Sequence, residues 1–145
     1  FHGYFTGKDQ ALDTRSFKHG WYYTGDTATR DADGYLWFIG RADDLITSAG
    51  YRISPFEVES TLIEHAAVVE SAVIAKPDAI RGEIVCAFVV LAEGYTGGDE
   101  LIKTIQDFCK VQSAPFKYPR EIRFVSSLPK TISGKIRRVE LRESL

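Results

Sequence analysis

The sequence contains no methionine, and it has only two cysteines and three histidines. Because it begins at Phe1 and offers no methionine for a translational start, we expect further residues upstream. Cys86 and Cys109 lie within apolar patterns and have no CxxC spacing, which argues against a disulfide or a zinc site. We therefore expect two buried free thiols in a reducing compartment, and we predict a cytoplasmic protein. The histidines have no ligand spacing, so we assign no metal to them.

Long hydrophobic runs are also missing. The longest unbroken apolar run, from Ile84 to Ala92, is too short to span a bilayer, which takes about 20 residues in a helix. No signal peptide is visible in the sequence. The formal net charge of -2 gives no reason to expect nucleic acid as a partner.

Positive charge is scarce in the middle of the chain and abundant at its end. Residues 43–112 carry five Lys or Arg side chains against twelve Asp or Glu, whereas residues 113–145 carry eight against three. This basic final segment predicts an anionic ligand, such as a phosphate, near the end of the chain.

The first part of the chain predicts a β-hairpin and no helix. An aromatic strand over Gly20–Asp26 is followed by a turn at Asp31–Gly34 and by a second strand over Tyr35–Gly40. A hairpin without a covering helix is typical of a piece of a larger domain. A short polar stretch then marks a candidate boundary, so we predict that residues 1–42 are the tail of a large N-terminal domain and that residues 43–145 form a small domain.

The second part alternates strand and helix patterns. A small hairpin with Gly50 at its turn precedes a helix that begins at Pro55, where Ser54 and Glu57 form a capping-box pattern. Apolar residues recur at helical spacing over residues 99–112, and a nearly continuous apolar strand over residues 83–91 predicts burial of both its faces. The other predicted elements are strands over residues 68–75 and 121–125, a loop over 128–135 and a terminal helix over 137–144. Two main helices over a small mixed sheet give an α+β fold.

Several segments carry a known pattern, in the order Tyr23–Asp26, Gly34–Ile46, Gly50–Glu59 and Pro129–Ile136. In order and spacing they resemble the adenylate-forming superfamily of acyl-CoA synthetases, luciferases and nonribosomal-peptide adenylation domains. The match lies in the C-terminal part of such enzymes. The stretches around Arg52 and Arg81 are most similar to the acetyl- and medium-chain acyl-CoA synthetase branch.

The resemblance implies a mobile C-terminal lid that serves two half-reactions at one active site. A carboxylic acid attacks ATP, which gives an acyl-adenylate and pyrophosphate. The lid then swings about a hinge, and the thiol of CoA displaces AMP. Mg²⁺ is expected with ATP, with its ligands outside this chain. The chain alone is expected to be inactive, because the acyl pocket, the adenine pocket and the first phosphate loop belong to the large domain.

Four positions match nucleotide contacts and the hinge of that family. Asp26 corresponds to a carboxylate that accepts hydrogen bonds from the ribose hydroxyls, although an Asp at this place can also stabilise its own turn. Arg41 and Arg52 correspond to arginines near the ribose and the phosphates, and Arg41 could equally form a surface salt bridge. Asp43 corresponds to the hinge, whose backbone rotation reorients the lid; alternatively, it is one of two solvated carboxylates with Asp44.

Lys135 is the residue to which the resemblance gives the catalytic role. It follows a flexible Ser133–Gly134 loop, and an ammonium there can reach the bridging oxygen, where charge develops during adenylation. The alternative is an ordinary surface lysine. A GxxxxGK[ST] phosphate loop is excluded, because Pro129 and Ile136 occupy two of its required positions. The family also implies that acylation of Lys135 would remove its charge and stop the first step.

Six further positions match the side of the lid that receives CoA: Ala49, Gly50, Tyr51, Arg81, Lys110 and Tyr118. A glycine at position 50 would leave room for the approaching thiol, although a hairpin turn also favours glycine there. Cations at positions 81 and 110 suit the phosphates of CoA. A cation at position 110 also suits the end of its own helix.

Two other functions stay open at this stage: an adenylation domain that loads a carrier protein, and a noncatalytic module that binds CoA or another protein. The short stretch after Lys135 contains no carrier domain, which favours CoA as the acceptor. The sequence leaves the acid open, from acetate and branched short acids to medium chains and aryl acids. It also leaves the oligomeric state open.

Overall fold

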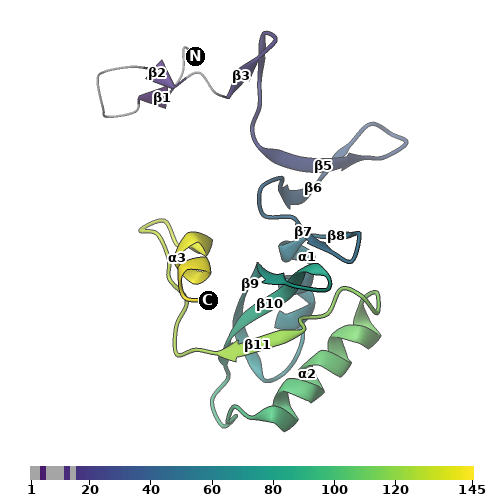
Figure 1. The fold of residues 1–145 in the computed structure, drawn as a ribbon, viewed down its shortest axis with the longest axis vertical. Helices are drawn as coiled ribbons and strands as arrows, with labels where there is room; N and C mark the ends of the chain where they lie inside the picture. Colours follow the sequence, from purple (N-terminus) through teal and green to yellow (C-terminus); the bar gives the residue numbers. More distant parts are fainter. Residues whose placement is uncertain (1–3, 6–11, 14–15) are drawn as a thin grey trace. The chain divides into compact units, whose positions relative to one another are not determined.

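The computed structural model describes residues 4–5, 12–13 and 16–145. The chain divides into two compact units, Phe1–Asp43 and Asp44–Leu145, and each is described by itself (Figure 1). Within the part of the chain that the structure describes, no helix is both long and apolar enough to cross a membrane.

The first unit consists of short antiparallel strand pairs. β1 (Tyr4–Phe5) pairs with β2 (Leu12–Asp13), and β3 (Phe17–Lys18) pairs with β4 (Trp21–Tyr22). The longest pair joins β5 (Asp26–Arg30) to β6 (Leu36–Arg41), with a shift in register after Thr27.

The predicted partner of the strand at 35–40 was wrong. The aromatic stretch pairs back with β3, and the partner of β6 is the more polar β5. The hydrogen bonds of the turn explain the difference. The Asp31 N–H donates to the Tyr35 carbonyl at 3.0 Å. The Asp31 carboxylate accepts from Tyr35 N at 2.9 Å and from Trp37 Nε1 at 2.7 Å. A turn closed at Asp31 makes Arg30 the partner of Leu36, so the strand must run back from Arg30.

The second unit is built around β10 (Gly82–Leu91). β9 (Val68–Asp78) runs antiparallel to it on one side, and β11 (Glu121–Phe124) runs parallel to it on the other. At its first residue β10 meets β7 (Ile46–Ser48), which forms a hairpin with β8 (Tyr51–Ile53). The mixed sheet confirms the predicted α+β fold.

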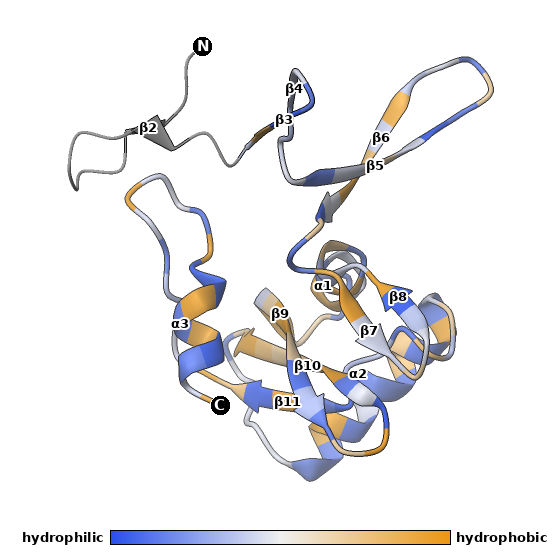
Figure 2. Ribbon diagram, turned by 45° about the horizontal axis from the view of Figure 1, so that its top comes forward, coloured by the Kyte–Doolittle hydropathy of each residue, from blue (hydrophilic) through white to orange (hydrophobic). Residues whose placement is uncertain are grey.

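Three helices complete this unit: α1 (Pro55–Ile63), α2 (Asp99–Gln112) and α3 (Arg138–Glu143). α2 has the predicted limits, because its apolar stripe is regular and Asp99 and Glu100 favour its N-terminus. Figure 2 shows hydrophobic and hydrophilic residues alternating along α2 and α3, as expected of helices with one buried side. α1 begins at Pro55 as predicted, but the capping box is not formed, because Ser54 makes no side-chain capping hydrogen bond.

The core has two parts, one on each face of β10. Val85, Ala87 and Val89 pack with α1 and α2, whereas Cys86 and Phe88 pack with Leu128 and with Leu141 of α3; all are buried. The prediction of a strand buried on both faces is therefore confirmed. Cys86 and Cys109 are buried and free, as predicted.

Candidate functional site

In the first unit, Arg41 joins the residues predicted to bind nucleotide to the predicted hinge. Its Nη1 donates to the Thr24 carbonyl at 2.7 Å and lies 3.2 Å from Asp26 Oδ1, and its Nε donates to Asp43 Oδ1 at 3.2 Å. The carboxylate of Asp43, and then that of Asp26, raises the pKa of Arg41. These groups are exposed, so their attraction contributes little to stability.

The turn before β5 brings Arg41 close to the backbone. Gly25 has φ +78, and a Cβ on it would lie 2.7 Å from Arg41 Nη2. The Ala42 N–H donates to the Gly25 carbonyl at 2.8 Å, and the Asp26 N–H donates to Thr24 Oγ1 at 3.1 Å. The hydrogen bond to Thr24 within the turn therefore comes from the Asp26 N–H. The Asp26 carboxylate pairs with Arg41 across the strand pair.

In the second unit, the β7–β8 hairpin carries three of the residues predicted to face CoA. Ala49 and Gly50 have φ +49 and +84, as in the type I′ turns that join two strands most tightly. The Ala49 N–H donates to the Arg81 carbonyl at 3.0 Å, which fixes the tip of the hairpin to the loop between β9 and β10. Tyr51 stacks on Phe116 with ring centroids 4.1 Å apart. Arg52, on the same hairpin, is exposed.

Lys110 and Tyr118, two of the residues predicted to contact CoA, lie close together. Lys110 Nζ lies 4.6 Å from the centre of the Tyr118 ring and donates to Asp107 at 2.8 Å, and this hydrogen bond raises the pKa of Lys110. Arg120 lies over the same ring at 4.9 Å and donates to the Tyr118 hydroxyl at 2.7 Å. We did not single out Arg120 from the sequence, although it stands in the basic final segment.

Arg81 lies directly before β10, in the loop that supports the hairpin. Its N–H donates to Asp78 Oδ1 at 2.8 Å, and this bond, together with the N–H of Ile80, lowers the pKa of Asp78. The positive charges of Arg81 and Arg120 also lower the pKa of Asp78. We call Arg81, Lys110, Tyr118 and Arg120 the cationic cluster.

Lys135 lies in an exposed loop that is closed by its own hydrogen bonds. The Thr131 N–H donates to the Lys135 carbonyl at 2.8 Å, and the Lys135 N–H donates to Thr131 Oγ1 at 3.1 Å. Lys130 and Ile136 form a bridge at its neck, and Gly134 has φ +81 at its tip. The backbone around Lys135 therefore forms a hydrogen-bonded turn, and the predicted flexibility of the Ser133–Gly134 loop stays a prediction.

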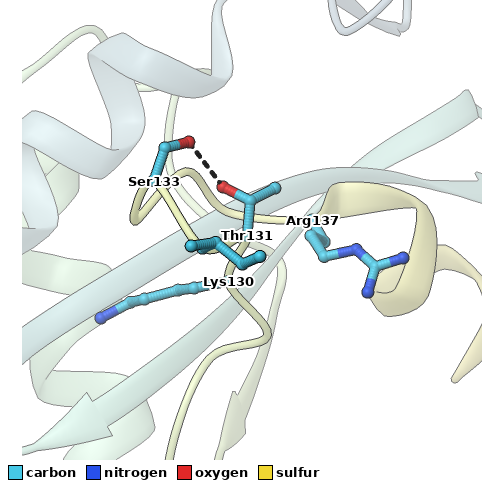
Figure 3. A pocket seen from close by; sticks show the side chains of 5 residues that line it. Lys130, Thr131, Ser133 and Arg137 are labelled. Carbon is cyan, nitrogen blue, oxygen red and sulfur yellow. Dashed lines mark hydrogen bonds between the residues drawn. The ribbon is translucent and has the colours of Figure 1, made fainter.

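A pocket is lined by five residues of this loop: Lys130, Thr131, Ile132, Ser133 and Arg137 (Figure 3). The hydroxyls of Thr131 and Ser133 are 2.9 Å apart, and the Lys130 and Arg137 side chains point away from each other. Lys130 pairs with Glu70 and Arg137 with Glu140.

The Lys135 loop and the cationic cluster lie on different sides of the sheet. The loop leads into α3, which packs on the face of Cys86 and Phe88. Tyr118 and α2, which carries Lys110, pack on the face of Val85 and Val89. Figures 1 and 2 both show α3 and the loop before it on one side of the second unit and β7–β8 on the other.

A scan against known families matches residues 57–135, more than half of the chain, to the AMP-binding enzyme C-terminal domain. The chain belongs to this family. The predicted membership of the adenylate-forming superfamily is therefore confirmed.

Relatives of this AMP-binding C-terminal domain include acyl-CoA synthetases and CoA ligases. The chain is 57% identical over 130 residues to acyl-coenzyme A synthetase ACSM4, mitochondrial, of Rattus norvegicus (88% of this chain, 22% of the relative). It is 51% identical over 142 residues to 4-hydroxybutyrate–CoA ligase 1 of Metallosphaera sedula (97% and 25%). The chain thus spans about a quarter or less of the length of these relatives.

A solved structure with a similar fold is also that of a CoA ligase. The anthranilate CoA ligase AuaEII, in complex with anthranoyl-AMP, is 46% identical to this chain with a TM-score of 0.79, over 90% of this chain and 25% of that one. The similarity covers the fold described above, and the role of each site residue stays a prediction.

Proposed function

We propose that this chain is the C-terminal part of an ATP-dependent acyl-CoA synthetase, which forms an acyl-adenylate and then an acyl-CoA, with release of pyrophosphate and AMP. The named relatives support this reaction class, since they are acyl-CoA synthetases and CoA ligases. A large N-terminal domain would supply the acid and adenine pockets. The observation that carries the proposal is the separation of the Lys135 loop from the cationic cluster on the two sides of one sheet.

In the first half-reaction, Lys135 would present its ammonium to the carboxylate and to the bridging oxygen of ATP. Its side chain is exposed, and its backbone is held by the turn with Thr131. A donor aimed at developing charge lowers the barrier most when its position is fixed beforehand, and its loss typically costs about 10²–10³ in rate. The defined turn therefore suits this role better than a mobile loop would.

In the second half-reaction, the other side of the unit would receive CoA. The cationic cluster offers positive groups to phosphates. The tip of the hairpin, at Ala49 and Gly50, would lie beside the thiol, and Tyr51 is held in place by stacking on Phe116. We extend the predicted set by Arg120, because it holds the Tyr118 hydroxyl.

A rotation at Asp43 would change which side of the second unit, the Lys135 loop or the CoA-binding side, faces the active site. The described chain divides directly after this residue, and Arg41 binds its carboxylate and that of Asp26. We propose that Asp26 and Arg41 contact the ribose and that Arg52 contacts the phosphates. Rotation at Asp43 would break the exposed ion pair to Arg41, which costs little.

Magnesium is expected with ATP in this chemistry. Among the described residues no group of three or more His, Cys, Asp or Glu side chains could hold a metal ion. We therefore assign no magnesium ligand to this chain and derive no step through the ion. The predicted cytoplasmic location stays a prediction, since the named rat relative is mitochondrial.

The test compares the synthetase that contains this chain with its Lys135→Ala variant. Acid-dependent pyrophosphate exchange measures the first half-reaction over a panel of short, branched, medium-chain and aryl acids. Thioester formation from a supplied acyl-adenylate measures the second. We expect the variant to lose about 10²–10³ in the first activity and to keep the second, because Lys135 acts only during adenylation.

Two outcomes would contradict the proposal. Equal loss of both activities would mean that Lys135 does not separate the half-reactions. A wild-type protein that performs neither reaction with any acid would favour a noncatalytic module that binds CoA or another protein, and transfer to a carrier protein instead of CoA would favour the other adenylation class.

A further inference from the structure

Four charged residues connect α3 to the start of the second unit. Arg138 Nη2 donates to both oxygens of Glu59, at 2.7 and 2.8 Å, and Arg138 Nη1 lies 3.9 Å from Asp44 Oδ2. Arg142 also donates to Asp44. We call Asp44, Glu59, Arg138 and Arg142 the α3 anchor.

Three of the four residues of the α3 anchor are mostly buried, whereas Arg142 is 41% exposed. The side chains of Glu59, Asp44 and Arg138 are only 10%, 17% and 23% exposed. Glu59 Oε1 also accepts from the Val73 N–H at 2.8 Å, and Arg138 Nε donates to the Val73 carbonyl at 3.3 Å. Burial raises the pKa of Glu59, while Arg138 and the Val73 N–H oppose that shift.

The anchor is poorly explained as a source of stability alone. A buried ion pair loses much of its attraction to desolvation, and well-packed apolar residues often replace it without loss of stability. α3 has only six residues, too few to be stable as an isolated helix, so contacts with the rest of the unit decide where it lies. Its buried Leu141 makes a non-directional contact, whereas hydrogen-bonded arginines fix the rotation of α3 and its position along its axis.

The position of α3 determines the position of Lys135. Lys135 precedes Arg138 by three residues, which span about 10 Å at most. The intervening backbone is closed as well, because the Arg137 N–H donates to the Pro129 carbonyl at 2.9 Å and Ile136 bridges to Lys130. A displacement of Arg138 would therefore pass directly to the turn that holds Lys135.

We propose that the α3 anchor is a set of positioning residues, which ties Lys135 to the residue that follows the hinge so that its ammonium reaches the acid-activating geometry. This inference rests on the proposed function. It adds that Asp44, adjacent to the predicted hinge Asp43, acts through Arg138 and Arg142 on the first half-reaction, without touching a substrate.

The main test uses Asp44→Asn, which removes one charge and keeps a similar shape. In the complete synthetase we expect acid-dependent pyrophosphate exchange to fall about ten- to a hundredfold, since a displacement of about 1 Å at a reacting group costs up to about 10²-fold. Thioester formation from supplied acyl-adenylate should stay unchanged. In a Lys135→Ala background Asp44→Asn should cost nothing further, because the anchor acts through Lys135.

Two variants make the comparison specific. Glu57→Gln removes the exposed ion pair with Lys117 from the same helix that carries Glu59, and it should leave both half-reactions unchanged. Arg142→Lys keeps the charge at an exposed position and should restore part of the loss seen for Arg142→Gln. Parallel loss of both half-reactions, or an additive loss in the Lys135→Ala background, would overturn the proposal.

Hydrogen exchange gives a readout that does not depend on activity. In the chain itself, Asp44→Asn should speed exchange of the Thr131, Lys135 and Arg137 amides about tenfold or more, and it should leave the amides of β10 protected. Unchanged exchange in the loop would overturn the proposal even if the synthetase activity were established. A wild-type protein without synthetase activity would instead contradict the proposed function, while the exchange result would still decide whether the anchor holds the loop.

Discussion

Cys86, on β10, packs in the cluster that includes Ile74 of β9 and Leu141 of α3, and Cys109 of α2 packs in the cluster on the other face of β10. Burial raises the pKa of each thiol from 9.0 to about 11. Because the thiolate is the reactive form, we expect iodoacetamide at about pH 8 to leave both cysteines unmodified in the folded chain and to modify both in urea. Mass spectrometry counts the adducts. Modification of either thiol in the folded chain at the rate seen in urea would contradict the burial described here.

Single-residue environments were predictable only where a local pattern determined them. The burial of both thiols followed from the apolar residues around them. Burial of Glu59 did not, because a carboxylate in an amphipathic helix is normally solvated, and its partner Arg138 lies 79 positions away. Arg120 was missed although its partner Tyr118 is only two positions away, because its contact with Tyr118 depends on the local backbone of the segment after α2.

At the scale of elements, a substitution in the β7–β8 hairpin can distinguish the two possible roles of Gly50, in the turn and beside the thiol of CoA. This residue has φ +84, and no atom lies within 4 Å of a Cβ placed on it. Gly50→Ala should therefore lower the free energy of unfolding by about 1 kcal/mol, the cost of the backbone conformation alone. If the glycine also leaves room for the thiol of CoA, thioester formation should fall by about tenfold or more, well beyond the stability effect.

Gly94 provides a matched control for this variant. It has φ +86 and equally open surroundings, in the turn after β10. Gly94→Ala should show a similar loss in urea denaturation and no effect on thioester formation. Equal thioester activity in the two variants would mean that Gly50 serves only the turn.

Elements with a strong period were predicted well, and those set by a turn were not. The stripe of α2 and the continuous apolar run of β10 gave their limits closely. β5 was missed because aromatic residues favour strands in general, without indicating which partner they take. Counting back from the Asp31 turn would have found it, since the partner of Leu36 must then be Arg30.

For the whole molecule, the core lies on one side of the boundary. Every buried hydrophobic side chain among the described residues lies between Ile46 and Leu141, whereas Trp21, Leu36 and Trp37 are exposed by 73%, 73% and 62%. Large apolar side chains that are exposed together in one part of a chain often contact another part of a protein. The sequence pattern agrees with this difference, because residues 1–42 show no helical pattern that could cover the hairpin.

We therefore expect residues 44–145 to fold alone. A chain that starts at Asp44 should keep a cooperative thermal transition within about 4 °C of that of the 145-residue chain, because about 1 kcal/mol shifts the midpoint of a domain of this size by about that amount. Residues 1–43 alone should give no transition by circular dichroism. A large fall in the melting temperature on removal of residues 1–43 would contradict this division.

The burial of β10 on both faces has a consequence for how the sheet is aligned. In a strand with one solvent-exposed face, a shift of the register by one residue exposes apolar side chains to water. The hydrophobic effect therefore determines the register of such a strand. A slip of β10 would exchange Ala87 with Phe88 and leave both faces dry. Correct alignment then depends on side-chain volume and on polar contacts along the strand, such as Thr47 N to Glu83 Oε2 at 2.7 Å and Arg120 N to the Val85 carbonyl at 2.9 Å. A shifted register would be disfavoured by poor side-chain packing and not by exposure of apolar groups to water. Substitutions that change side-chain volume in β10 would therefore allow mispairing before they cause unfolding.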